Sequence, residues 1–184
     1  MMSYISRWGL MDHLSEHCKE VYAHFGLAMY RAQCVEQSII QLIVFFDFFP
    51  TNLPKYKATE QWAKDFDKYD GLLSSKTMGQ LLKNLNTLNA VDPTIEELLR
   101  KALNQRNWLA HRFFVDHALS FLSSNGRDKM IQDLEENREL FNTVENILNP
   151  ITHSLCEKYG LTQEKRKEME RELFRDANGD IEQP

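Results

Sequence analysis

The hydrophobic positions follow helical spacing along almost the whole chain. Between Leu14 and Phe46 the apolar steps alternate between three and four residues. Such a seam predicts one long helix of about 35 residues, which Pro50 and Pro54 are expected to end. The members of this seam are Leu14, Cys18, Val21, Phe25, Ala28, Ala32, Val35, Ile39, Leu42 and Phe46.

Two shorter helices are expected next. Residues 58–69 carry Trp62 and Phe66 one turn apart, and Asp70-Gly71 is expected to stop this helix. Ser75 suits the N-cap of a helix over 76–88.

Two segments are expected to lie outside the helices. We expect a loose lead-in over 1–11. The loop 50–57 places two lysines around Tyr56, an arrangement that either contacts nucleic acid or is simply solvated.

Two more long helices complete the pattern. Thr94 and Glu97 form a capping-box sequence, so a helix is expected from about Ile95 to Ser123, with Asn125-Gly126 as the break. Another is expected over 128–159, where Pro150 would kink or split it. Alternating strand-like patterns are absent from the sequence. The pattern therefore predicts an all-α fold, an antiparallel helical bundle with three long helices plus short ones.

The length fits a single domain over residues 1–184. We expect its core over about 12–160, then a charged C-terminal helix over 162–175 and a flexible tail over 176–184. Seven glycines and five prolines are few for a loop-rich β fold of this size, which again favours helices.

Charge and cysteine content restrict the function classes. The net charge of −5 argues against a protein that coats nucleic acid non-specifically, so any such contact must be local. Cys18, Cys34 and Cys156 are widely spaced and form no CxxC pair, which indicates reduced thiols and a cytoplasmic protein. We expect no signal peptide, because residues 1–10 contain no long apolar run. We also expect no membrane span, because the most apolar run, over 39–49, is short and interrupted.

The strongest chemical signal lies in the helix expected over 95–123. Arg106 falls in the middle of its apolar stripe, and His111 lies roughly 140° further round the helix. Asn107 sits on the arc between them, and Ala110 leaves room there. A guanidinium in such a stripe is unfavourable unless something pairs with it, and such breaks of a local rule tend to mark functional sites. Two readings stay open: a functional pair, or an Arg held by an interior carboxylate beside a structural His.

Other chemistry is weakly supported. The sequence contains neither GxxxxGK[ST] nor GxGxxG. His13 and His17 are one turn apart and could either hold a metal, with Cys18 nearby, or form a plain exposed pair. Arg31 and Glu36 flank the centre of the first helix, where they either form a solvated edge or reach the site around Arg106.

Arg106 and His111 together suit RNA cleavage. A neutral imidazole can take the proton of a ribose 2′-OH, and a guanidinium can stabilise the extra negative charge on the pentacovalent phosphorus. Asn107 can orient either group or bind a phosphate oxygen. The products would be a 2′,3′-cyclic phosphate and a free 5′ end, with no cofactor and no metal.

The stretch Arg106-Asn107-x-x-x-His111 resembles the R-x(4–6)-H signature of HEPN domains, in which a polar residue often follows the Arg. Arg112 and Phe113 come after the His, where many relatives carry an aromatic residue, and Lys76-Thr-Met-Gly-Gln80-Leu-Leu is similar to a segment of several HEPN groups. The resemblance covers much of residues 14–123, although its specific part is short.

The resemblance implies an all-α homodimer in which two motifs meet in one cleft. It implies a metal-independent endoribonuclease acting as a toxin or as a phage-defence or stress effector, with RNA as substrate and an antitoxin protein as a further partner. Arg106, His111 and Asn107 would be catalytic, and Arg112, Glu36 and Arg31 are our candidates for substrate binding. Phe113 stands where one subgroup carries a Tyr that is modified with AMP, so that regulation is not expected here. The alternative is a non-catalytic HEPN-type dimer that serves as an interaction or regulatory module.

Overall fold

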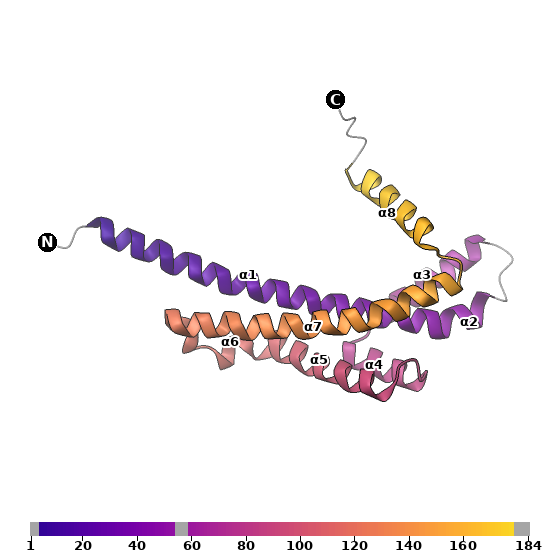
Figure 1. Cartoon of the computed structure of the whole chain (residues 1–184), viewed down its shortest axis with the longest axis horizontal. Coiled ribbons are helices and arrows are strands. Elements are labelled where there is room, and N and C mark those ends of the chain that lie inside the picture. Colours follow the sequence, from indigo (N-terminus) through magenta and orange to yellow (C-terminus); the bar gives the residue numbers. More distant parts are fainter. Residues whose placement is uncertain (1–3, 54–58, 179–184) are drawn as a thin grey trace, which may run out of the picture.

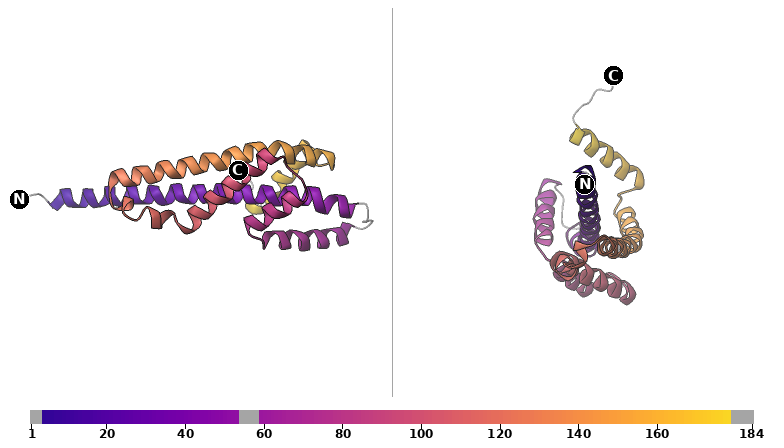
Figure 2. Two further views of the ribbon diagram at one scale, coloured as in Figure 1. Left: turned by 90° about the horizontal axis from the view of Figure 1, so that it is seen from below. Right: turned by 90° about the vertical axis from the view of Figure 1, so that its left-hand side faces the viewer.

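Two long helices that lie side by side form the frame of the molecule (Figures 1 and 2). The computed structural model describes residues 4–53 and 59–178, and these ranges contain helices and no strand. Helix α1 (Tyr4–Ile43) passes through a π-helical turn (Val44–Phe48) into α2 (Phe49–Asn52). Helix α7 (Ser124–Lys158) packs along it. The predicted all-α fold is confirmed.

The shorter helices cover the sides and one end of this frame. They are α3 (Thr59–Ser74), α4 (Met78–Thr87), α5 (Pro93–His111), α6 (Phe113–Asp116) and a 3₁₀ turn (Ser120–Leu122). Helix α5 packs against α1, α4 and α7. The last helix, α8 (Gln163–Asn178), leans away from the body (Figure 1). The predicted antiparallel packing is found between α5 and each of the two long helices, but not between the long helices themselves. Helices α1 and α7 run in the same direction, since residues 17, 24 and 38 bond to residues 128, 135 and 145.

The predicted seam of α1 is the centre of the core. Its members Val21, Ala28, Ala32, Val35, Ile39 and Leu42 are each at most 1% exposed. Alanines at two of these positions leave room for a close neighbouring helix, and α7 fills it with a matching stripe: Met130, Leu134, Phe141, Val144 and Leu148.

Among the described residues, the helical segment Glu16–Asn52 is long enough and apolar enough to cross a membrane, judged by length and composition alone. In this fold 61% of its most apolar window is buried. A core helix passes the same length and composition test. Pro50 does not end it, because this residue occupies the first turn of α2, where a missing N–H is tolerated.

Three predicted boundaries in the first half of the chain are wrong. Helix α3 continues past Gly71 to Ser74, so Asp70-Gly71 is not its stop. The N-cap of α4 is Thr77 rather than Ser75, since Thr77 and Gln80 exchange the two capping-box hydrogen bonds. The N-cap of α5 is Asp92, whose carboxylate accepts from the N–H groups of Thr94 and Ile95 at 2.8 and 3.1 Å.

The largest difference concerns the helix expected over 95–123. Helix α5 ends at His111, because Arg112 leaves helical geometry with φ −127° and ψ −26°. The chain then forms α6 and the 3₁₀ turn before Ser123 caps α7. Asn125-Gly126 therefore lies in the first turn of α7, and Pro150 neither splits nor ends that helix.

The chain ends also differ from expectation. The described part of the predicted lead-in, residues 4–11, belongs to α1, and α8 extends the expected C-terminal helix to Asn178. The rest of the predicted tail, over 179–184, and the charged loop residues Lys55, Tyr56 and Lys57 lie outside the described residues.

Gly126 marks a close contact between α7 and the 3₁₀ turn. A Cβ at this position would lie 2.0 Å from the backbone oxygen of Ser120. Arg127, 3% exposed, donates to the carbonyl of Phe121 at 2.9 Å and fixes the same turn. The segment between α5 and α7 is therefore held tightly at its far end.

We expect Gly126→Ala to lower the free energy of unfolding by about 1–3 kcal/mol, because the contact is with backbone that cannot move aside cheaply. Gly71→Ala in α3 is the control, since no atom lies within 4 Å of its added Cβ. It should raise stability by about 0.4–1 kcal/mol. Urea unfolding of both variants measures the difference, and equal stabilities would contradict the contact.

Candidate functional site

Arg106 lies at the boundary between the core and solvent on α5. Its side chain is 28% exposed, and its Nη2 atom lies 3.9 Å from Oε2 of Glu36, whose side chain is 17% exposed. Glu36 comes from α1, so the ion pair joins two elements that are packed together. Of the two residues predicted to flank the first helix, Glu36 is the one that reaches Arg106.

Asn107 and His111 occupy the outer side of α5, one turn apart. The Asn107 amide oxygen accepts from Nη1 of Arg106 at 3.3 Å, so these neighbours are in contact. His111 is exposed, and no hydrogen bond or ion pair links it to any residue in the described part of the chain. The last turn of α5 thus presents an exposed imidazole, and the guanidinium that Glu36 and Asn107 position lies five residues earlier on the same helix.

Asp116 holds the segment after the motif against α5. Its carboxylate accepts from the Trp108 indole N–H at 2.9 Å and from Arg112 at 2.7 Å. The indole hydrogen bond, and then the positive charge of Arg112, lower the pKa of the Asp116 carboxyl below its usual range. Arg112 is consequently tied to its own segment, and the structure records no contact between it and Arg106 or His111.

His117 links the same segment to α7. Its Nε2 atom lies 3.1 Å from Oδ2 of Asp133, and its side chain is 16% exposed. The ring also packs on Phe113 and Trp108, with centroid distances of 4.8 and 5.8 Å. Trp108 is therefore fixed from several sides.

Arg31, the other candidate on α1, stays apart from the motif. Its guanidinium lies 5.8 Å from the centroid of the Tyr30 ring, and its Nε atom is buried without a hydrogen-bond partner among the described residues. Glu36 is poorly suited to bind the phosphate of a substrate directly, because its carboxylate repels a phosphate. Its contact with Arg106 indicates an orienting role.

The alternative metal site has little support in the described residues. His17 is engaged with α7, since its Nε2 atom lies 3.2 Å from Asp128 and its Nδ1 atom 3.4 Å from the Ser124 hydroxyl. The side chain of His13 lies outside the described residues. Among the residues that are described, no group of three or more His, Cys, Asp or Glu side chains could hold a metal ion.

Two functional candidates escaped the sequence reasoning. Asp116 was hidden because its contact with Trp108 requires the chain to leave α5 at Arg112. Asn137 was visible in principle: it falls between Leu134 and Phe141 in the buried stripe of α7 and is only 8% exposed. A polar residue in an apolar stripe is the same signal that singles out Arg106.

Replacing Trp108 by Phe should raise the pKa of Asp116 toward its ordinary value of 3.8, because the indole donor is removed. The titration of the Asp116 carboxyl carbon, followed by NMR, measures this pKa. Trp62→Phe, which removes an indole N–H that has no partner among the described residues, is the matched control and should leave the Asp116 pKa unchanged.

The same carboxyl gives a pH dependence. Its folded-state pKa is depressed, so it stabilises the fold above its ordinary pKa, and this stabilisation is lost as the pH falls through the folded pKa. Trp108→Phe should therefore show a smaller loss of stability in acid than the parent protein. An unchanged Asp116 titration in this variant would contradict the hydrogen bond.

Comparison with known proteins gave no match. No family model, no curated protein and no solved structure matches the chain.

Proposed function

We propose that the protein is a metal-independent endoribonuclease of the HEPN type. The observation that carries the proposal is the state of the two motif side chains. Arg106 is held in place by Glu36 and Asn107, and His111 stands exposed and unpaired in the described part of α5. A fixed cation and a free imidazole on the same helix suit phosphodiester cleavage without a cofactor.

The ion pair leaves Arg106 able to bind phosphate. Its distance from Glu36, 3.9 Å, is beyond hydrogen-bond range, so the carboxylate attracts the guanidinium without using its N–H groups. A guanidinium carries five N–H donors in a fork that fits two phosphate oxygens, and Asn107 accepts only one of them. Glu36 is in this view a positioning residue.

The reaction needs one base and one stabilised charge. His111 takes the proton of a ribose 2′-OH, and the 2′-oxygen attacks the adjacent phosphorus. The bond from phosphorus to the 5′-oxygen breaks, and that oxygen takes a proton from solvent. Arg106 stabilises the negative charge that builds up on the phosphate oxygens, and the products are a 2′,3′-cyclic phosphate and a 5′-hydroxyl.

A homodimer is part of the proposal. The segment directly after the motif exposes three large aliphatic side chains, with Val115 at 60%, Leu119 at 84% and Leu122 at 76%. Exposed apolar side chains gathered in so short a segment are typical of an interaction surface. A second copy of the chain on this surface would bring a second His111 near the first.

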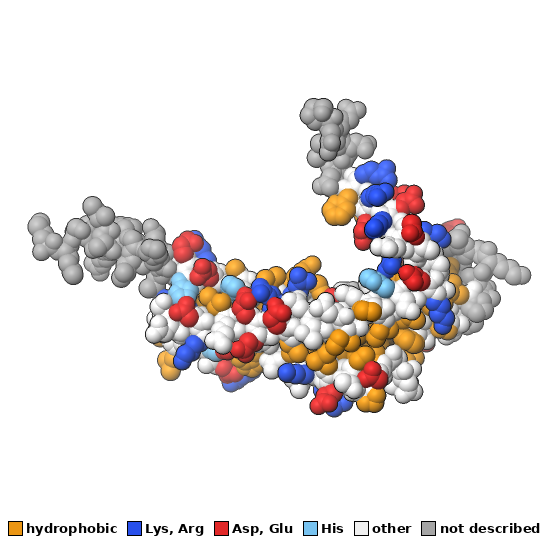
Figure 3. All heavy atoms as spheres, in the orientation of Figure 1, with side chains coloured by type: hydrophobic (Ala, Val, Ile, Leu, Met, Phe, Trp, Pro, Cys, Tyr) orange, Lys and Arg blue, Asp and Glu red, His pale blue; other side chains and the backbone are white. Residues whose placement is uncertain are grey.

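The biological role follows from the resemblance. A toxin, phage-defence or stress effector in the cytoplasm would cut cellular or invading RNA, and an antitoxin protein would restrain it. Acidic and basic side chains are mixed on the face of the molecule seen in Figure 3, which fits a local RNA contact and a net charge of −5.

A non-catalytic HEPN-type module is the second candidate, and the Arg106–Glu36 pair favours it. A half-buried Arg paired with a carboxylate can have a purely structural role, because replacing Arg106 would leave the Glu36 carboxylate unpaired. The two candidates predict opposite results for the exposed His111, which contributes no packing.

We expect purified protein to cleave RNA in the presence of EDTA, and His111→Ala to lower the rate at least about 100-fold, the usual contribution of a general base. The unfolding midpoint should stay unchanged, because His111 is exposed and makes no described contact. Mass spectrometry should find 2′,3′-cyclic phosphates, and 2′-deoxy substitution at the cleaved nucleotide should block the reaction.

His153→Ala is the matched control, since His153 is also an exposed helical histidine, on α7. It should leave cleavage intact. Equal cleavage by His111→Ala and the parent protein would remove the nuclease assignment. A parent protein that cleaves no RNA, combined with an Arg106→Ala variant that loses stability, would establish the module instead.

We expect the double change Leu119→Glu and Leu122→Glu to weaken self-association at least about tenfold, because charges then replace exposed apolar surface. Light scattering with size-exclusion chromatography measures the mass. Leu173→Glu on α8, also exposed, is the control and should leave the dimer intact. A dimer that survives the double change would place the interface elsewhere.

A further inference from the structure

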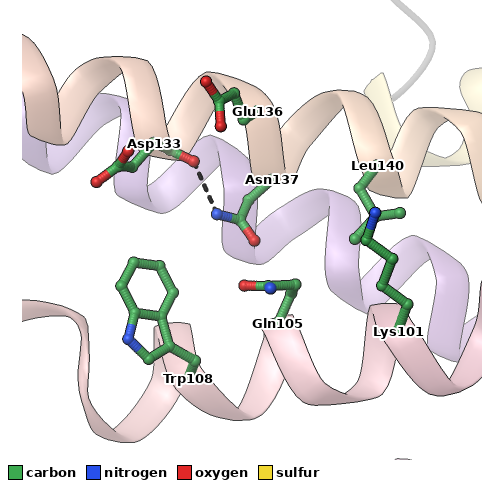
Figure 4. Close-up of a pocket in the computed structure, with 7 residues that line it drawn as sticks. All are labelled: Lys101, Gln105, Trp108, Asp133, Glu136, Asn137 and Leu140. Carbon is green, nitrogen blue, oxygen red and sulfur yellow. Dashed lines mark hydrogen bonds between the residues drawn. The ribbon is translucent and has the colours of Figure 1, made fainter.

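A groove between α5 and α7 lies beside the motif and has no role in the chemistry above. It has a volume of about 650 Å³, within the usual range of small-molecule sites. Lys101, Gln105 and Trp108 line it from α5, and Asp133, Glu136 and Asn137 line it from α7 (Figure 4). Trp108 stands at one end and Lys101 at the other.

Asn137 contributes an unpaired acceptor to this groove. The residue is 8% exposed, and its Nδ2 atom donates to the Asp133 carbonyl at 2.7 Å. That bond fixes the amide orientation, since a carbonyl cannot donate to an amide oxygen. The Oδ1 atom is consequently the one turned toward Gln105 across the groove, and it is buried without a partner (Figure 4).

A buried acceptor without a donor is unfavourable, so the groove is incomplete as it stands. The Gln105 amide makes no hydrogen bond within the described part of the chain, and its donor and acceptor are both available. On the α7 wall Asn137 therefore offers an acceptor, and on the α5 wall Gln105 offers both a donor and an acceptor. Amide side chains of this kind recognise the polar edges of nucleobases.

Trp108 adds a rigid aromatic surface. Its indole N–H is bound to Asp116, and its ring packs edge-on against Phe113 with a centroid distance of 5.3 Å. An aromatic ring that is fixed before a ligand arrives loses little freedom when a base stacks on it. Trp108 and His111 are three residues apart on α5, so a nucleotide stacked here adjoins the proposed base of the reaction.

The charges of the groove select the base rather than the phosphate. Asp133 and Glu136 place two carboxylates along the α7 wall, against the single ammonium of Lys101. Both already have partners, since Asp133 pairs with His117 and Glu136 accepts from Gln132, so their part in the groove is mainly their negative charge. Carboxylates repel a phosphate but accept hydrogen bonds from ring and exocyclic N–H groups. Guanine carries two adjacent N–H donor groups and a carbonyl acceptor on one edge, which suits the unpaired Asn137 oxygen together with the acceptor and donor of the Gln105 amide.

We propose that this groove binds a guanine base of the RNA substrate and sets which nucleotide lies at the cleavage site. The proposal rests on the nuclease function for its biological meaning, but not for its test, because binding of a free nucleotide requires no cleavage. Asn137 and Gln105 act here as specificity residues, and Trp108 is the stacking surface.

The experiment is calorimetric titration of the full chain with each of the four ribonucleoside monophosphates. GMP should bind at least tenfold more tightly than AMP, CMP or UMP. Asn137→Leu removes the unpaired oxygen and should weaken GMP binding at least tenfold, while the unfolding midpoint stays within a few degrees of the parent value. Gln105→Ala, on the opposite wall, should weaken GMP binding as well.

Asn142→Leu is the matched control. Asn142 is a half-buried asparagine on the same helix, outside the groove, where it donates to Glu139. This variant should bind GMP as the parent protein does. Equal affinities for all four nucleotides, a preference for a different base, or unchanged GMP binding in Asn137→Leu would each overturn the proposal.

Failure of the two proposals is distinguishable. If GMP binds selectively and no RNA is cleaved, the groove assignment stands and the nuclease assignment falls. If RNA is cut with equal rates after every base and Asn137→Leu cuts it identically, the nuclease assignment stands and the guanine site falls.

Discussion

Two consecutive phenylalanines that pack on one ring of α1 hold the segment after α5 against the core. The Phe25 ring contacts both Phe113 and Phe114, with centroid distances of 5.7 and 5.0 Å. Both residues belong to α6, so their packing anchors this short helix on α1. The chain leaves α5 at Arg112, and this makes His111 the last residue of α5. The break also returns Asp116 to Trp108, so the motif and the groove depend on the same packing.

The Arg106–Glu36 pair explains how a charged residue is tolerated in the stripe of α5. Both side chains keep partial contact with solvent, which limits the desolvation that a fully buried pair would suffer. The pair also joins the motif to α1, the helix that organises the core. Arg106 is thus positioned by the frame of the fold, whereas His111 depends only on the end of α5. Of the two residues proposed to be catalytic, His111 is therefore the one whose replacement tests chemistry without removing an ion pair of the fold.

The sequence was sufficient for the parts of the fold that depend on local pattern. The α1 seam was predicted because each of its buried positions follows from helical spacing. The end of α5 was missed because residues 112–122 keep apolar spacing, and only contacts with α1 and with Arg127 show that they leave the helix. The parallel course of α1 and α7 was equally inaccessible, since it depends on how the intervening helices fold back. Within the site, Arg106 and His111 stood out locally, Glu36 was one of two candidates, and Asn137 was overlooked although it interrupts a stripe as Arg106 does.

Arg106 and Asn137 are the two polar residues that interrupt apolar helix stripes. They lie on different sides of α5, and they suit different parts of a nucleotide. Arg106 faces α1 and offers positive charge, which a phosphate requires, whereas Asn137 faces α5 from α7 and offers a neutral acceptor among carboxylates, which a phosphate avoids. A protein of net charge −5 gains little affinity for RNA from its overall field. In the proposed nuclease, selectivity would then come from short-range contacts, and a fixed ring with an unpaired amide oxygen is a physical basis for such contacts.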